Sequence, residues 1–391
     1  MPFARAAEML GALCGVQISE ATARREAEGY GANYVAVQEE EVARIERDTP
    51  PPPQGPQEQL LSVDGAMVPL LHGEWAEVKT LVLGVIEEPK KEKGVRVTHT
   101  RDLSYFSRLS PAETFQRLAL VETQRRGVET AGRVIAPLDG AEWEQKFLDY
   151  HRPDAVRILD FAHAAEYVAK MGAAVWGLGT PTTQQWLSRQ LTTLKGQGPA
   201  IVLPELRALT TGHPQLTELA GYLEYLEKRE AQMQYPIYLA QGWPIGSGAV
   251  ESGNKLVVEA RLKGAGMHWA REHVNPMLAL RNAVCNDRWV EAWPQICASR
   301  QRQRAQIRQA RYEQRHTSVP LPLPQKAPEA PLILAPKATV SPASTAPAVD
   351  VSATAAQPRQ PWRPPPDHPW RRFRFGKALF KHDPSEPIAK K

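Results

Sequence analysis

The sequence has few of the residues and segments that mark secreted or membrane proteins. Three of its 391 residues are cysteines, at Cys14, Cys285 and Cys297. An odd number of cysteines, scattered along the chain, argues against a disulfide scaffold and against a zinc site built from paired cysteines. No apolar run approaches the roughly 18 residues that cross a membrane, and the first ten residues, MPFARAAEML, lack the apolar core of a signal peptide. We therefore expect a soluble cytoplasmic protein with no membrane partner.

Acidic residues are scarce in the last quarter of the chain. Residues 299–391 hold 17 Lys and Arg but 6 Asp and Glu, a net charge of +11. Residues 1–298 hold 31 Lys and Arg and 37 Asp and Glu, a net charge of −6. A basic tail on a near-neutral or acidic body is typical of proteins that bind a polyanion. The alternative is a basic solubilising tail without a partner.

The first 48 residues read as a small helical module. A helix is expected over residues 3–14, and Ser19 is a suitable N-cap for a second helix that begins EATARREAEGYG. Two helices joined by a short turn have the outline of a helix-turn-helix motif, with Arg24 and Arg25 on the second helix as candidate DNA contacts. An ordinary helical hairpin has the same outline.

After a proline-rich linker at residues 49–59, the pattern indicates an α/β fold with a mixed sheet. We expect a first strand from Leu60 to Asp64, strands at 76–88 and 95–106 with a Lys/Glu-rich turn at 89–94 between them, a helix at 112–127, a strand at 133–139, a helix at 142–152, a strand at 155–160 and a helix at 161–176. Residues 60–176 would form the first part of the core, 177–235 a helical insertion, 236–298 the second part of the core, and 299–391 an Arg-rich segment and a Pro/Ala-rich disordered tail.

Two aspartates are expected at strand ends. Asp64 would end the first strand and Asp139 the fourth, and a glycine follows each. If those two strands are parallel neighbours, the two carboxylates share one cleft and repel each other unless a divalent cation neutralises them. The alternative is a pair of ordinary turn aspartates.

A third acid, Glu251, lies in the first turn of a helix that follows the small-residue turn 245–248. Lys255 and Glu259 would follow on the same helix face, where a solvated Glu–Lys–Glu array is the structural alternative. The glycine-rich approach favours a functional role for Glu251 more than for Glu259.

At the junction of the fifth strand with its helix, Asp160 and His163 are three residues apart. They could form a hydrogen bond, orient nucleic acid, or simply provide an N-cap through Asp160. Glu142 and Glu144 read as ordinary first-turn helix acids.

Four segments resemble the conserved blocks of one family: SVDGAMVPL, APLDGAEW, ILDFAHAAEYV and PIGSGAVESGNKLVVEARLKGAGMHW. In this order they are similar to the blocks of ISKra-type bacterial insertion-sequence transposases. That family belongs with the Mutator-like group of DDE transposases, which share an RNase H-like fold. The resemblance covers about residues 1–295, and the later segment DHPWRRF is similar to the tail of that family.

The resemblance implies that Asp64, Asp139 and Glu251 are the three catalytic and metal-binding acids. Asp160 with His163 matches the [Cys/Asp]-x-x-His signature of the group. Asp160 is also the competing choice for the second acid, because it too is expected to end a strand.

The implied function is that of a DNA transposase, which uses two Mg²⁺ ions (with Mn²⁺ as a substitute) to cut transposon ends and to join the 3′-hydroxyl to target DNA. Its partner would be double-stranded DNA, synapsis implies a homo-oligomer, and its place would be the bacterial nucleoid. The alternatives are an RNase H-like nuclease without strand transfer and an inactive DNA-binding derivative that represses transposition. Expected phosphate contacts, besides Arg24 and Arg25, are Lys255, Arg261, Lys263, Arg300, Arg302, Arg304, Arg308, Arg311 and Arg315.

Overall fold

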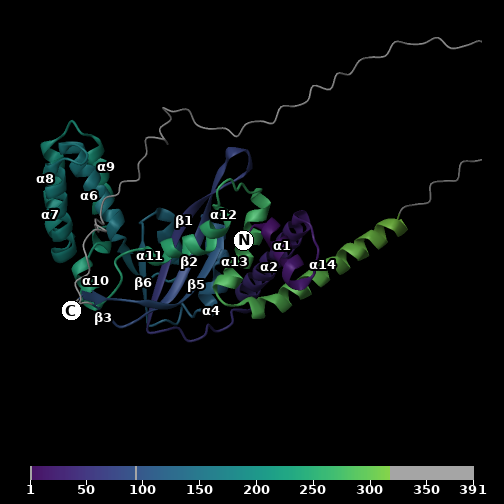
Figure 1. Cartoon of the computed structure of the whole chain (residues 1–391). Coiled ribbons are helices and arrows are strands. Elements are labelled where there is room, and N and C mark those ends of the chain that lie inside the picture. Colours follow the sequence, from purple (N-terminus) through teal and green to yellow (C-terminus); the bar gives the residue numbers. More distant parts are fainter. Residues whose placement is uncertain (1, 93–94, 318–391) are drawn as a thin grey trace, which may run out of the picture. The chain divides into compact units, whose positions relative to one another are not determined.

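The computed structural model describes residues 2–92 and 95–317, which belong to one compact unit. These residues form the predicted α/β fold, with helices on both faces of a five-stranded mixed sheet (Figure 1). The expected Pro/Ala-rich tail lies outside the described residues. Within the described ranges, no helix is both long and apolar enough to cross a membrane.

The sheet has the order β5-β2-β1-β6-β7. Its strands are β1 (Glu58–Pro69), β2 (Trp75–Ile86), β5 (Thr100–Arg108), β6 (Arg133–Leu138) and β7 (Val156–Leu159). The β2 strand runs antiparallel to both of its neighbours, β1 and β5, while β6 runs parallel to both β1 and β7. The first and fourth predicted strands are therefore parallel neighbours.

The prediction that the first strand ends at Asp64 is wrong. The β1 strand continues to Pro69 because its ladder with β2 runs unbroken from Gln59 to that residue. On its other side, β1 pairs with β6 only as far as Leu60. Asp64 therefore lies in the middle of β1. At Asp64 the strand pairs with β2 on one side and has no ladder bonds to β6 on the other.

Alternate residues of β1 face two different layers of helices. The odd-numbered residues Leu61 and Val63 pack with α2 (Glu20–Asp48), α3 (Ala112–Leu118) and α5 (Glu142–His151). The even-numbered residues Leu60, Ala66 and Val68 face α6 (Phe161–Trp176), α11 (Gly248–Gly253) and α13 (Arg271–Cys285). Asp64 has the even parity, and so it belongs to the face that α11 covers.

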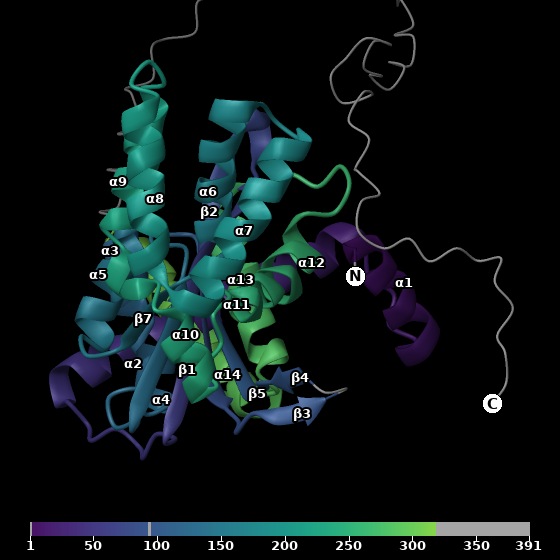
Figure 2. The same ribbon diagram turned by 90° about the vertical axis from the view of Figure 1, so that its left-hand side faces the viewer.

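The predicted helical insertion is present between α6 and α11. Together with α6 its helices form a group that extends beyond β7 (Figures 1 and 2). They are α7 (Pro181–Gln197), α8 (Pro199–Gly212), α9 (Glu218–Glu227), a 3₁₀ turn at Glu230–Gln232 and α10 (Tyr235–Gln241).

Two local predictions need correction. The Lys/Glu-rich turn expected at 89–94 contains strand β3 (Lys90–Glu92), which pairs with β4 (Val95–Val97) as a small hairpin, so the third main strand begins only at β5. The single helix expected over 112–127 is interrupted at Ala119, between α3 and α4 (Leu120–Arg125).

The N-terminal segment contains the two predicted helices, but the second is longer than expected. Helix α1 spans Phe3–Cys14, and the Ser19 hydroxyl accepts the backbone N–H of Thr22 at the start of α2, as an N-cap does. Helix α2 has 29 residues and packs against α13 and α14 (Trp289–Thr317). At Gly31 the approach to α13 is so close that a Cβ atom would lie 2.3 Å from the Pro276 carbonyl oxygen.

The proline-rich segment is packed against the core rather than free. The backbone N–H of Gly55 donates to the Thr130 hydroxyl at 2.8 Å, and a Cβ atom on Gly55 would lie 2.2 Å from the Gly127 carbonyl oxygen. Strand β1 begins two residues after Pro56, inside the stretch that was expected to be linker. The segment therefore fixes the entry into β1.

Candidate active site

The register between β1 and β6 brings Asp64 and Asp139 together. Paired residues of these strands differ by 75 in number, as in Leu60 with Ile135. The same offset, carried past the end of the ladder, brings Asp64 level with Asp139, and both residues line one cleft. Pro137 has no N–H for a ladder bond, but the Ser62 hydroxyl donates to its carbonyl at 2.6 Å and continues the register. Asp139 directly follows β6, as predicted.

Both oxygens of Asp64 accept hydrogen bonds. The backbone N–H of Gly65 donates to Oδ1 at 2.6 Å, and Asn254 Nδ2 donates to Oδ2 at 2.8 Å. Burial, and next the negative charge of Asp139, nevertheless raise the pKa of Asp64 to about 6, against the two hydrogen bonds, which lower it. Burial and the neighbouring negative charge thus outweigh the two hydrogen bonds in setting the pKa of Asp64.

Asp139 has a raised pKa for a similar reason. Burial is the largest cause, and the nearby charges of Asp160 and Glu251 act in the same direction. His163 is the one neighbour that acts strongly against them and lowers the pKa of Asp139. Asp139 therefore stands in a group of acids rather than alone in a turn.

Glu251 lies in the first turn of α11, as predicted, and its charge raises the pKa of both Asp64 and Asp139. Its side chain is exposed, and the Ser247 hydroxyl donates to its Oε1 at 3.3 Å. Among the residues that the structure describes, no group of three His, Cys, Asp or Glu side chains has the arrangement needed to hold a metal ion.

A π-helical turn at Asn254–Glu259 directly follows α11, the helix that carries Glu251. This turn changes the helical register, so the expected i, i+4, i+8 face of Glu251, Lys255 and Glu259 is not a regular α-helical face. Glu259 instead pairs with Lys263 at 2.8 Å. Lys255 is exposed.

Asp160 is an N-cap and also a cross-link between two segments. Its Oδ1 accepts the backbone N–H of His163 at 2.7 Å, and its Oδ2 accepts the backbone N–H of Ser247 at 2.6 Å. The residue is 4% exposed. Both oxygens hold backbone groups, so Asp160 fits a structural role better than that of second metal ligand.

Asp64 and Asp139 open into a cleft of about 350 Å³. The side chain of His163, Tyr167 of α6, and Tyr225 and Arg229 beyond it in the insertion line the same cleft. Its remaining lining residues are Gly65, Glu77, Gly140, Ala141, Trp143 and Glu144. The cleft thus combines acids with an aromatic and cationic wall.

Two residues at this site did not stand out in the sequence. Glu144 is 2% exposed and accepts the backbone N–H groups of Gly140 and Ala141 at 2.9 and 3.1 Å. Burial, followed by the charges of Asp139 and Asp64, raises its pKa to about 8. The other is Asn254, whose Oδ1 is buried without a hydrogen-bond partner in the structure described.

Arg261, which we expected to contact DNA phosphates, packs against two aromatic rings instead. Its guanidinium lies 4.6 Å from the ring centre of Phe3 and 4.8 Å from that of Trp269, and burial lowers its pKa. Arg24 lies 3.9 Å from Glu28, and Arg25 is exposed on the same helix. Arg261 therefore packs the N-terminal helix onto the segment after α12 (Ala260–Leu262).

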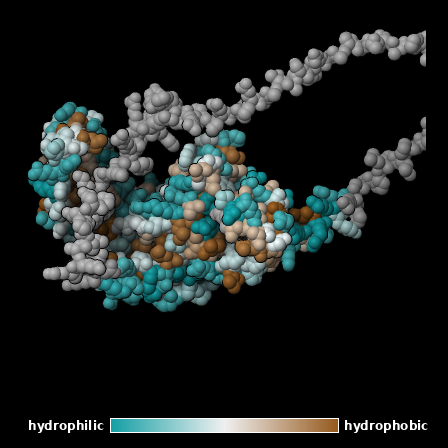
Figure 3. Space-filling view, viewed as in Figure 1, coloured by the Kyte–Doolittle hydropathy of each residue, from teal (hydrophilic) through white to brown (hydrophobic). Residues whose placement is uncertain are grey.

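The arginine-rich segment is helical, and its first part packs against α2. Arg300 pairs with Glu26 at 2.6 Å and lies over the ring of Tyr30, and Arg302 pairs with Glu40 at 3.1 Å. Arg300, expected to contact phosphate, is therefore engaged by α2 instead. Further along α14 the surface is mainly hydrophilic (Figure 3), with exposed Arg304, Arg308 and Arg311. The side chain of Arg315 lies outside the described residues.

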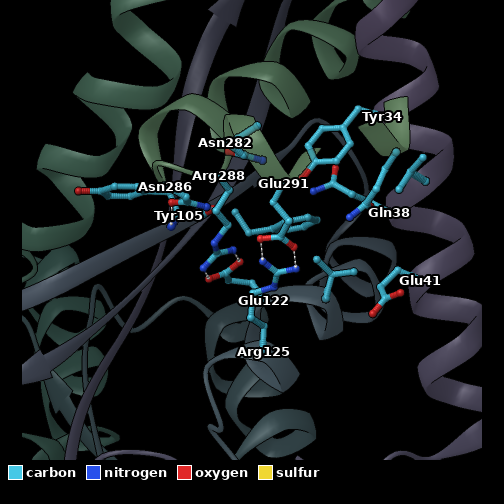
Figure 4. A pocket seen from close by; sticks show the side chains of 15 residues that line it. Tyr34, Gln38, Glu41, Tyr105, Glu122, Arg125, Asn282, Asn286, Arg288 and Glu291 are labelled. Atoms are coloured by element: carbon cyan, nitrogen blue, oxygen red, sulfur yellow. Dashed lines mark hydrogen bonds and ion pairs between the residues drawn. The ribbon is translucent and has the colours of Figure 1, made fainter. Parts of the chain in front are cut away.

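A second polar cavity, of about 130 Å³, lies between α2, α4, α13 and α14. Figure 4 shows its two ion pairs, in which Arg125 donates twice to Glu291 and Arg288 donates twice to Glu122. Both arginines are paired with carboxylates, and the two ion pairs join α4 to the start of α14. The chemistry-bearing acids are those of the first cleft.

In comparisons with known proteins, no protein-family model and no curated protein matches the chain. The functional interpretation therefore depends on the cleft. Asp139 and Glu251 both raise the pKa of Asp64, and Glu251 also raises that of Asp139, whereas Asp160 holds backbone groups.

Proposed function

We propose that this chain is a DDE-type DNA transposase with an RNase H-like fold, which cuts transposon ends and joins the freed 3′-hydroxyl to target DNA. The observation that supports the proposal is that Asp64 of β1 and Asp139 after β6 line one cleft, with Glu251 of α11 near enough for its charge to raise the pKa of both. Three antiparallel strands followed by two parallel ones, with a central acidic cleft, also agree with an RNase H-like interpretation.

The donor chemistry of the cleft fits Mg²⁺. This ion prefers oxygen ligands, and the cleft offers carboxylates whose pKa values are raised mainly by burial and further by neighbouring negative charge. The buried, unpaired Oδ1 of Asn254 adds a neutral oxygen beside Asp64. We assign Asp64, Asp139 and Glu251 as the residues that would hold two Mg²⁺ ions. When bound, the ions would activate the attacking oxygen and stabilise the leaving oxygen of a phosphodiester.

The residues of the chain itself have distinct tasks in this proposal. Gly65 and Asn254 fix the orientation of the Asp64 carboxylate through their N–H groups. The Glu251 side chain is exposed, so it is the acid that can move most freely to complete the set of three metal ligands with Asp64 and Asp139. An acidic cleft alone would repel DNA, so phosphate contacts must come from basic groups around it. Exposed Arg25, Lys255 and the outer arginines of α14 are the candidates.

A strand-transfer assay with the full chain, Mg²⁺ and DNA carrying the element's ends tests the proposal. Asp64→Asn and Asp139→Asn should each abolish cutting and joining while DNA binding remains, because each change removes one charge and keeps the shape. Glu142→Gln is the matched control, since that acid is exposed and pairs with Lys146. Cutting without joining by the wild-type chain would indicate a nuclease, and binding alone a repressing derivative.

A further inference from the structure

The turn that carries Asp139 is held by two side chains of the helical insertion. The Tyr225 hydroxyl donates to the backbone carbonyl of Asp139. Arg229 donates to the next carbonyl, that of Gly140, from Nε at 3.1 Å and from Nη2 at 2.6 Å. Two side chains more than 80 residues away in the sequence therefore donate to the carbonyls of two consecutive residues, Asp139 and Gly140.

These two side chains are themselves held rigidly. The guanidinium of Arg229 lies 3.7 Å from the centre of the Tyr225 ring and donates to the Tyr225 carbonyl at 2.9 Å. On its other side Tyr225 stacks on Tyr167 of α6, with ring centres 3.8 Å apart and planes 3° apart. Planar groups stacked in this way lose little further freedom when they donate a hydrogen bond.

Gly140 is what allows the contact. Its φ is +84°, and a Cβ atom there would lie 2.5 Å from Arg229 Nε and 2.8 Å from the Tyr225 hydroxyl oxygen. Any other residue would strain the turn and displace both donors. Glu144 accepts the N–H of Gly140 and that of Ala141, so the turn is bound through its carbonyls by the insertion and through its amides by α5.

We propose that Tyr225 and Arg229 are positioning residues for Asp139, so that the helical insertion is part of the active site rather than an appendage beside it. The catalytic meaning of this arrangement rests on the proposed function, but the hold on the turn does not. A misplaced catalytic group costs rate even when its own side chain is intact. The insertion would thus set how well Asp139 can serve as a ligand.

The test compares four full-length variants with the wild type. Tyr225→Phe removes one donor and keeps the ring stack, and Arg229→Lys keeps the charge and loses the two-pronged donation. Tyr222→Phe, in the same helix, and Arg207→Lys, whose arginine pairs with Glu227 across the insertion, are the matched controls.

The first measurement is hydrogen exchange of the backbone amides at residues 140–141. Loss of one positioned hydrogen bond should speed exchange there by about threefold to tenfold in both test variants and leave it unchanged in both controls. The second is Mn²⁺ affinity of the DNA-free protein by calorimetry, which should weaken in the test variants alone. The third is cleavage, where the rate should fall about tenfold or more at unchanged DNA affinity.

Unchanged exchange in both test variants would overturn the proposal. So would an exchange effect that the control variants share, because it would mean general loosening of the insertion. If the wild type neither binds Mn²⁺ nor cuts DNA, the proposed function fails, while the exchange measurement still decides whether α9 and Arg229 hold the Asp139 turn.

Discussion

Replacing Glu144 by glutamine is expected to change how the stability of the fold depends on pH. Burial and the charges of Asp139 and Asp64 raise the pKa of Glu144 from 4.5 to about 8. A carboxyl whose pKa is higher in the folded state stabilises the fold fully below its unfolded pKa. That stabilisation is lost as the pH rises through the folded pKa. The relevant window for Glu144 is therefore pH 4.5 to about 8.

The magnitude follows from the protons bound. Inside this window the folded chain binds up to one more proton at Glu144 than the unfolded chain, so the free energy of unfolding falls by up to about 1.4 kcal/mol per pH unit. Over two pH units this amounts to about 2 to 3 kcal/mol. A glutamine is neutral at every pH and keeps an oxygen that can accept the N–H groups of Gly140 and Ala141. The variant should lack this contribution to the slope.

Urea denaturation of both proteins at several pH values between 5 and 8 measures the effect. The Glu144→Gln variant should gain stability relative to the wild type as the pH rises. Glu142→Gln serves as control, because the Glu142 side chain is exposed and its change should leave the slope in place. A stability difference between Glu144→Gln and wild type that does not vary with pH would refute the reasoning.

Three further predictions address the site and its surroundings. Asn254→Ala removes a hydrogen bond that lowers the pKa of Asp64, so the acid limb of the cleavage pH profile should move to higher pH. An unmoved limb would mean that Asp64 does not govern it. Arg300→Ala should lower the free energy of unfolding by about 1 to 3 kcal/mol, because it removes a largely buried arginine together with its ion pair to Glu26 and its ring contact. Arg304→Ala should change it by less than about 0.5 kcal/mol, and equal effects in thermal denaturation would contradict the packing of α14. Deleting residues 318–391 removes 11 of the 48 Lys and Arg and should reduce the slope of log DNA affinity against log salt by about 0.9 per lost phosphate contact. An unchanged slope would assign DNA binding to the rest of the chain.

Several features of this protein could be predicted from the sequence because they depend on residues close together in the chain. The N-cap at Ser19, the end of β6 just before Asp139 and the N-cap at Asp160 all follow from local hydrophobic period and side chains that bond their own backbone. The spacing of 75 between Asp64 and Asp139 also proved to be the register of two parallel strands. The pairing of those strands was a condition that the sequence alone left open.

Only the tertiary structure decided what surrounds each of these residues. Asp64 is in mid-strand because β2 continues to pair beyond it, and Glu144 is buried because the Asp139 turn folds over it. Asn254 reaches Asp64 across 190 positions, and Arg300 reaches Glu26 across 274. Such contacts have no local signature, since burial and charge depend on which distant segments pack together. The sequence therefore identified which acids to examine, and packing determined which of them line the cleft and which hold backbone groups.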